Sequence, residues 1–152
     1  MEDQISGKLT CSLDMIRIEG GKLWALMDIR YPVLLNLEEM VRRAQESLAP
    51  CRVTVAGSRK PHYVSEQTEL VQQLLETYHE MTGGEKKAIA IGGGTYAQSL
   101  EEGVAFGALF PGEEEMAHQA DEYISEESLF QNARIFARAI VRLAGEKEEN
   151  AK

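Results

Sequence analysis

Residues 89–123 contain, in order, Ile89-Ala-Ile-Gly-Gly-Gly-Thr-Tyr-Ala-Gln98, Gly103-Val-Ala-Phe-Gly-Ala-Leu-Phe-Pro-Gly112 and His118-Gln-Ala-Asp-Glu-Tyr123. A short apolar run over 87–91 enters a turn of three glycines, and a second run of small and apolar residues covers 104–110. Short apolar runs bounded by Gly and Pro are typical of buried strands. The stretch therefore predicts two strands, joined through a glycine turn and followed by a loop with one histidine among carboxylates.

A helix is predicted on each side of these strands. Ser65 is placed to cap a helix over 66–81, which Gly83 ends, and Ser125 is placed to cap a last helix that runs to Ala144. The buried faces are expected to carry Leu70, Val71, Leu74, Leu75 and Tyr78 in the first helix and Leu129, Ala133, Phe136, Ile140 and Leu143 in the second. Residues 61–152 thus form an α/β piece with too few strands for a complete sheet, and 147–152 form a charged tail.

The residues before this piece predict strand, strand, helix, strand. Residues 8–18 and 22–31 alternate apolar and polar side chains around Gly20-Gly21, which indicates a half-buried antiparallel hairpin. Asn36 can cap a helix that ends near Pro50, and 51–55 form a further short strand. This β-β-α-β order is half of a ferredoxin-like α+β sandwich. A connector over 57–61 divides the chain into domains of residues 6–60 and 61–152.

Composition limits the partners and the compartment. The chain has 152 residues and a formal net charge of −9, which argues against binding to nucleic acid or to an anionic membrane. It contains no apolar run of the ~18 residues needed to cross a bilayer, and its first residues are acidic, unlike a signal peptide. We therefore expect a cytoplasmic protein, in which Cys11 and Cys51 are buried, reduced thiols.

Three groups of residues are candidates for chemistry, and each has a plainer explanation. His118 is suited to bind a transition metal, with a nearby carboxylate supporting its other ring nitrogen, or is simply a hydrogen-bonded loop residue. The glycine turn before Thr95 can present amide groups to an anion, or is a tight turn with special dihedrals. Arg30, at a strand end, can hold a carboxylate with two hydrogen bonds or pair with Asp28.

Taken together, four segments resemble the PepV-like dipeptidases, a branch of the dinuclear zinc aminoacyl-peptidases that includes carnosinases and carboxypeptidase G. The segments are Asp28-Ile-Arg-Tyr-Pro32, Ala90-Ile-Gly-Gly-Gly-Thr-Tyr-Ala97, Gly103-Val-Ala-Phe-Gly-Ala-Leu-Phe-Pro-Gly112 and Ala117-His-Gln-Ala-Asp-Glu-Tyr-Ile124. The resemblance extends over nearly the whole chain. It implies that 6–60 are the second half of a ferredoxin-like lid domain and that 61–152 are the C-terminal part of a zinc-peptidase catalytic domain.

The resemblance also implies roles for individual residues. His118 matches the last zinc ligand in chain order, and Glu122 matches a residue that supports it. Arg30 matches the lid arginine that binds the C-terminal carboxylate of a short peptide substrate, and Gly93, Gly94 and Thr95 match the turn that also receives that carboxylate. Gln98 departs from the pattern, because relatives place an arginine there.

The remaining zinc ligands and the catalytic carboxylate of such enzymes belong to sequence ahead of residue 1. We therefore predict that this chain is the C-terminal fragment of a zinc dipeptidase, has no catalytic residue of its own and is inactive alone, since one ligand of about four holds zinc weakly. The alternative is a non-catalytic binding or self-assembly module with a ferredoxin-like sheet. Uncovered sheet edges in a half domain also predict a homo-oligomer.

Overall fold

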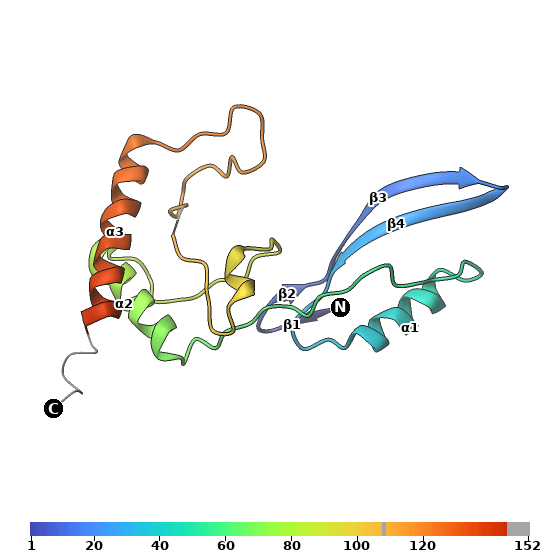
Figure 1. Ribbon diagram of the computed structural model, residues 1–152, viewed down its shortest axis with the longest axis horizontal. Coiled ribbons are helices and arrows are strands. Elements are labelled where there is room, and N and C mark those ends of the chain that lie inside the picture. The colour runs from blue at the N-terminus through green and yellow to red at the C-terminus, as the bar shows by residue number, and fades with distance from the viewer. Residues whose placement is uncertain (108, 146–152) are drawn as a thin grey trace. The chain divides into compact units, whose positions relative to one another are not determined.

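The computed structural model describes residues 1–107 and 109–145 and has a mixed α and β fold (Figure 1). It divides into two compact units. The first contains residues 1–63 and 90–94, and the second contains 64–89 and the described residues from 95 onward. None of the helices in the described part of the chain has the length and hydrophobicity needed to span a bilayer. The charged tail expected over 147–152 lies outside the described residues.

The hairpin of the first unit forms as the sequence predicts. Strands β3 (Thr10–Glu19) and β4 (Lys22–Arg30) pair in antiparallel fashion, and Gly20 and Gly21 form the turn with φ values of 57° and 75°. Two consecutive positive φ angles define the type I′ turn, whose twist matches that of the flanking strands. A smaller antiparallel pair, β1 (Glu2–Asp3) with β2 (Gly7–Lys8), precedes the hairpin.

A register shift between Leu13 and Met15 gives the hairpin one fully apolar face. The shift leaves Asp14 unpaired, so the residues after it change sides relative to those before it. The pairs Cys11–Ile29, Leu13–Met27, Ile16–Ala25 and Ile18–Leu23 therefore all lie on the same face. The other face carries Arg17, Trp24, Asp28 and Arg30 among its residues.

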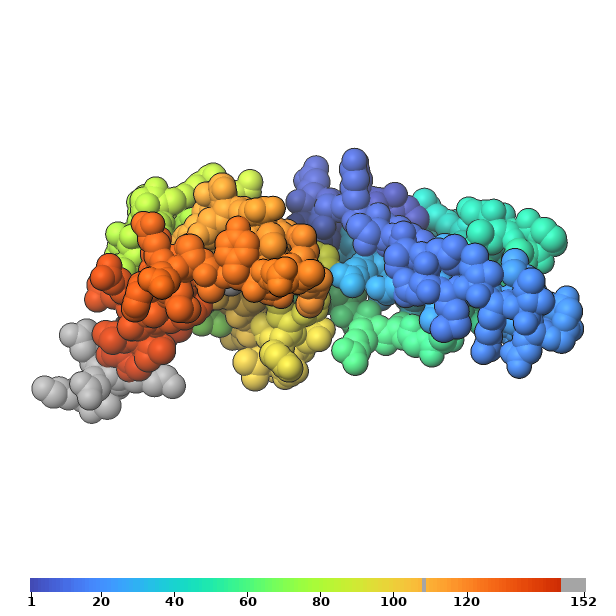
Figure 2. All heavy atoms as spheres, turned by 90° about the horizontal axis from the view of Figure 1, so that it is seen from above, coloured from blue at the N-terminus to red at the C-terminus, as the bar shows by residue number. Residues whose placement is uncertain are grey.

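The expectation of half-buried strands is wrong, because neither face of this hairpin is covered. Every residue of β3 is exposed, and Ile18 retains 77% of its accessible surface. In the space-filling view, the blue atoms of the hairpin form an outer surface (Figure 2). Cys11 is consequently exposed, and so is Cys51, which corrects the prediction of buried thiols. A two-stranded sheet has no layer of its own to bury its apolar side against.

Helix α1 (Leu37–Ser47) follows the hairpin and starts at the predicted cap, where the Asn36 side chain accepts a hydrogen bond from the Glu38 amide at 2.7 Å. The strand expected over 51–55 does not form. Instead, the Gln45 side chain makes two hydrogen bonds to this segment. It donates to the Cys51 carbonyl at 2.7 Å and accepts from the Val53 amide at 2.9 Å. A strand needs a neighbouring strand for its backbone groups, and the Gln45 amide substitutes for one here.

The second unit is built on two long helices, α2 (Glu69–Thr82) and α3 (Glu126–Gly145), with a short 3₁₀ helix, η1 (Tyr96–Ser99), between them. The cap of α2 is Thr68 and not Ser65 as predicted, because Ser65 opens a preceding turn in which its carbonyl accepts from the Thr68 amide at 3.1 Å. Gly83 ends α2 with φ 72°, as expected. Ser125 caps α3 by accepting from the Ser128 amide at 3.1 Å.

The α2–α3 contact forms the buried core of this unit. Val71 and Leu74 lie on the expected face of α2, but the fully buried Thr77 was not anticipated. The buried side of α3 consists of Ser128, Asn132, Ile135 and Ala139. The predicted face of Leu129, Ala133, Phe136, Ile140 and Leu143 is therefore wrong, and most of it is exposed. Polar groups decide this packing, since the Arg142 guanidinium donates to Thr77 at 2.9 Å and to Glu80 at 2.6 Å.

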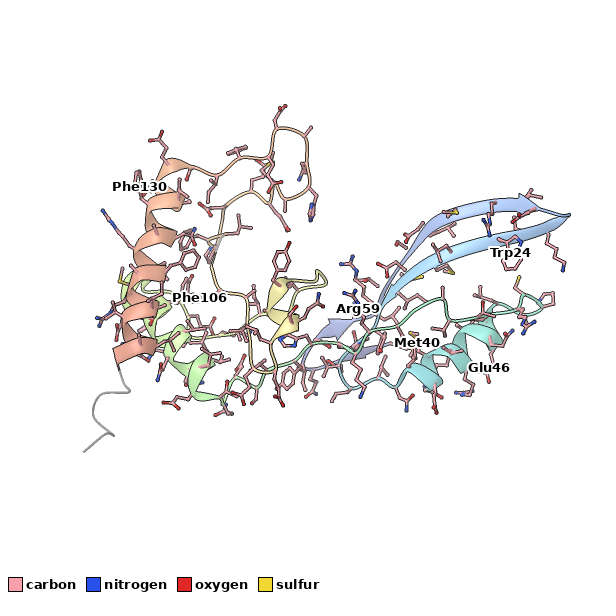
Figure 3. All side chains as sticks on the ribbon, in the orientation of Figure 1. Trp24, Met40, Glu46, Arg59, Phe106 and Phe130 are labelled. Atoms are coloured by element: carbon pink, nitrogen blue, oxygen red, sulfur yellow. The ribbon has the colours of Figure 1, made fainter. Side chains whose placement is uncertain are left out.

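Neither of the two strands predicted around the glycine turn forms in the part of the chain that the structure describes. Residues 87–91 form no ladder and Ile89 is 83% exposed, while 104–107 and 109–110 are also irregular. The second segment packs on α3 instead. The ring of Phe106, which Figure 3 labels, has its centroid 6.1 Å from that of Phe136. Gly107 has φ 90°, and a Cβ there would lie 2.9 Å from Asn132 Oδ1. Without neighbouring strands, these apolar runs have nothing to pair with.

Candidate functional site

Arg30 contacts the glycine turn. It lies at the end of β4, 62 residues from Gly92, and its Nη1 donates to the Gly92 carbonyl oxygen. Its Nε donates to the Asp28 carboxylate at 3.3 Å, so the pair that was the plainer alternative for this arginine also exists. Both contacts are made within the first unit. The guanidinium is thus held at two points, and it retains further N–H groups for another acceptor.

The glycine turn itself has an open backbone. Neither Gly92 nor Gly93 adopts a positive φ, and nothing lies nearer than 3.9 Å to a Cβ built at either position. The explanation that special dihedrals require glycine here is therefore not supported for these two residues. Gly92, Gly93 and Gly94 are exposed, and Thr95 is half-buried at the start of η1. Exposed amides without side chains beside them are suited to approach an anion.

His118 lies in an exposed loop before α3, with the left-handed φ of 64°. This conformation is uncommon for residues other than glycine. The Glu122 carboxylate accepts a hydrogen bond from the His118 backbone amide at 3.2 Å. The carboxylate thus stabilises the backbone turn that presents the histidine, and no bond from Glu122 to a ring nitrogen is seen. Asp121 has a similar φ of 59°.

The predicted site residues form two groups, one in each unit. Arg30 lies with Gly92, next to Gly93 and Gly94, and His118 lies with Glu122. Thr95 directly follows Gly94 in the chain but belongs to the second unit. The Gly92 carbonyl was not foreseen as a partner of Arg30, because no local pattern links residues so far apart in the sequence. Glu113 was not among the predicted site residues, yet it links the preceding loop to α3. Its carboxylate accepts from the Ser128 hydroxyl and, at 2.7 Å, from the Phe110 amide.

These hydrogen bonds, first that from Ser128 and then that from Phe110, hold the pKa of Glu113 below its usual value of 4.5. A lowered pKa in the folded state contributes stability that is complete above the unfolded pKa and is lost as pH falls through the folded pKa. Below about pH 4.5, we therefore expect Glu113→Gln to lose less stability on acidification than the unchanged protein. Urea midpoints at pH 7 and pH 3.5 measure this difference. The exposed neighbour Glu114, changed to Gln, is the control, and an equal acid-induced loss in the Glu113 variant would contradict the expectation.

Comparison with known proteins identifies the family of this chain. Residues 6–142 match the model of the peptidase family M20/M25/M40. The chain belongs to this family. Because the match covers both units, Arg30, the glycine turn and His118 all lie inside the region that defines the M20 relationship.

Three relatives match this chain over almost its whole length, and in each the match covers the same share of the relative. The protein named "Putative dipeptidase YtjP" of Bacillus subtilis is 42% identical over 144 residues, which are 94% of this chain and 31% of that protein. Proteins of Staphylococcus saprophyticus and Staphylococcus haemolyticus that carry the same functional name are 32% and 33% identical, again over 31% of their lengths. The chain thus spans about a third of the relatives that it matches.

Metallopeptidases of the M20 family require metal, so the donor set of this chain is informative. Within residues 1–107 and 109–145, no group of three or more His, Cys, Asp or Glu side chains comes together to hold a metal ion. A zinc site needs three or four protein ligands. The described residues therefore do not form a complete metal centre by themselves.

Proposed function

We propose that this chain is the C-terminal part of a metal-dependent dipeptidase that hydrolyses short peptides. In this proposal, residues 6–60 are the second half of a ferredoxin-like lid, and 61–152 are the C-terminal part of the catalytic domain. The family membership, the names of the relatives and the third of their length that this chain covers support this proposal.

The hydrogen bond from Arg30 to the Gly92 carbonyl is the observation that carries the proposal. It brings the proposed lid arginine to the turn whose amides, at Gly93, Gly94 and Thr95, are proposed to receive the same substrate carboxylate. A guanidinium group and backbone amides that bind the same carboxylate favour peptides with a free C-terminus strongly over peptides that lack one at this position. Dipeptides are favoured over longer peptides because their C-terminus can reach this point while the scissile bond remains at the metal.

His118 is proposed to supply one zinc ligand. Among the described residues, its imidazole donates no hydrogen bond to Glu122, whose carboxylate accepts from the His118 backbone amide instead. Glu122 would fix the loop conformation and hence the direction of the imidazole. The other ligands and the catalytic carboxylate are proposed to come from the region of the relatives outside the match, so we expect the isolated chain to be inactive.

Complementation tests this function. The isolated chain is expected to retain substoichiometric zinc after gel filtration and to leave an Ala-Ala substrate intact. Co-expression with the part of the Bacillus subtilis relative that lies outside the match is expected to restore both zinc binding and hydrolysis. His118→Ala should abolish the restored activity, whereas His79→Ala, an exposed histidine at the end of α2, should preserve it. Hydrolysis by the isolated chain, or none by the zinc-loaded complex, would refute the proposal.

A second candidate is a non-catalytic self-assembly module, which the uncovered apolar face of the hairpin favours. Two copies could pair through the free edges of β3 and β4 or through the apolar face formed by Leu13, Ile16, Ile18 and Leu23. Sedimentation at micromolar concentration would then show dimers that increase with salt, because each copy carries a net charge of −9. Ile18→Lys should disperse them, and a monomer at all salt concentrations would exclude this candidate.

A further inference from the structure

The loop that carries His118 begins after Phe110 and ends at Ser125, where α3 starts. Figure 1 shows it as the orange segment that extends from the N-terminal end of α3. Every residue over 114–127 is exposed except the half-buried Met116. Burial therefore contributes little to holding this loop in one position, because a segment with few buried side chains opens easily.

Hydrogen bonds inside the loop are local. The Glu122 carboxylate accepts from the His118 amide at 3.2 Å. The Gln119 amide donates to the Met116 carbonyl at 3.1 Å, and the Gln119 side chain donates to the Glu115 carbonyl at 2.8 Å. These bonds join residues close together in the sequence, so they fix the shape of the turn that presents the histidine. They do not fix where that turn lies relative to α3.

Glu113 connects the two ends of the loop. Its carboxylate oxygens have different partners, since Oε2 accepts from the Phe110 amide at 2.7 Å and Oε1 accepts from the Ser128 hydroxyl. Ser128 lies 15 residues further along the chain, in the first turn of α3, and is only 4% exposed. Its hydroxyl also accepts from the Ser125 hydroxyl at 2.9 Å. The loop is thus joined to a buried residue of α3 through a chain of hydrogen bonds, which strengthen one another.

A tight turn places the Glu113 carboxylate for both contacts. The Glu113 amide donates to the Phe110 carbonyl at 3.1 Å, and Gly112 between them has φ 91°. Pro111 followed by a glycine of positive φ is the pattern of a type II turn. Phe110 and Glu113 are therefore bonded to each other in both directions, which holds the start of the glutamate side chain in place beside α3.

We propose that Glu113 is a positioning residue for His118, because it connects both ends of the loop that presents the imidazole. The inference rests on the proposed function, since the direction of this imidazole matters to the reaction only if His118 is a metal ligand. A single carboxylate that closes the loop at its base reduces the number of positions open to the turn at its far end. A misplaced group at a reacting centre lowers the rate strongly, even when the displacement is small.

Hydrogen exchange in the isolated chain tests the connection without metal or substrate. In Glu113→Ala, the amides of His118 and Gln119 are expected to exchange roughly tenfold faster, because the loop loses two bonds to a charged group. Ser128→Ala should have an effect of the same kind, and the double variant should exchange no faster than Glu113→Ala, since both changes remove the same connection. Glu114→Ala alters the exposed neighbour and should change these rates less than about twofold.

The complemented enzyme tests the positioning role. Glu113→Ala is expected to lower kcat for Ala-Ala about tenfold and to weaken zinc binding, measured by competition with a chelator, about tenfold. KM should change less than about twofold, because the substrate-binding role proposed for Arg30 does not involve this loop. Ile135→Ala removes a buried side chain of the same helix and should leave kcat and zinc affinity unchanged at a temperature where circular dichroism shows it folded. If Glu113→Ala does not keep native helicity, Glu113→Gln, which retains one acceptor oxygen, should show the same changes to a smaller extent.

The outcomes separate this inference from the proposed function. Unchanged exchange at His118 and Gln119 in the Glu113 variant would overturn the inference whatever the activity. Faster exchange with unchanged kcat and zinc affinity would also overturn it, because the connection would then serve only the fold. Faster exchange and weaker zinc binding in the Glu113 variant, with no hydrolysis of Ala-Ala by the unchanged zinc-loaded complex, would support the positioning role and refute the dipeptidase function.

Discussion

Arg30→Lys is expected to lower kcat/KM for Ala-Ala by roughly 10- to 100-fold in the complemented enzyme, since a hydrogen bond between charged groups contributes about 1.5–3 kcal/mol. Lysine keeps the charge but lacks the planar fork. A single ammonium group cannot bond Asp28 and Gly92, as Arg30 does, while it also presents two parallel donors to a substrate carboxylate.

The comparison substrate makes this test specific. With Ala-Ala amide, which has no terminal carboxylate, the Arg30→Lys variant and the unchanged enzyme are expected to have the same kcat/KM. Arg17→Lys is the matched variant, because Arg17 lies on the same face of the hairpin and pairs with Glu19 at 3.6 Å. It should leave both rates unchanged. An equal loss on both substrates in the Arg30 variant would mean that the arginine supports the fold and does not bind the carboxylate.

Ile135→Ala is expected to destabilise the second unit by about 2–5 kcal/mol, the range found when a large aliphatic side chain in a core is replaced by alanine. Ile135 is 2% exposed, and among the described residues the other buried apolar side chains of this unit are Val71, Leu74 and Ala139. So small a core has few other contacts to compensate for the cavity. Urea unfolding followed by circular dichroism at 222 nm measures the loss.

Ile140→Ala is the control for this prediction. It makes the same chemical change on the same helix, five residues further along, but Ile140 is 66% exposed. Its effect on the isolated chain should stay within about 0.5 kcal/mol, as for most surface substitutions. If the two variants were equally destabilised, the assignment of Ile135 to the inside of α3 and Ile140 to the outside would be wrong.

The features predicted correctly are those that neighbouring residues determine. Gly20-Gly21 forms the hairpin turn because these residues adopt positive φ angles without steric cost. Asn36 and Ser125 start their helices because a short polar side chain bonds a free amide of the first turn. The M20 relationship was also visible in the sequence, since the residues of four segments carry it independently of their arrangement in space.

The features that were missed depend on residues that are remote in the sequence. Apolar runs at 51–55, 87–91 and 104–110 were predicted to be strands, but a strand also needs a partner for its backbone groups, and the described residues of these segments have none in a sheet. The capping of α2 moved from Ser65 to Thr68 because the Ser65 carbonyl is used in a turn. Apolar composition therefore indicated which segments tend to be extended, but it did not determine whether they pair with other strands.

The sequence by itself determined the Gly20-Gly21 turn and the caps at Asn36 and Ser125, because short-range sterics and hydrogen bonds specify them. It also carried the family relationship, in the residues of its four segments. Only the tertiary structure decided that Ile135 and not Ile140 is buried, because the buried side of α3 includes the polar Ser128 and Asn132 and is less apolar than the exposed side. Arg142 joins α3 to α2 through its bonds to Thr77 and Glu80. The tertiary structure alone brought Arg30 to Gly92. A contact across 62 residues follows from how a chain folds back on itself, which no periodicity in its sequence encodes.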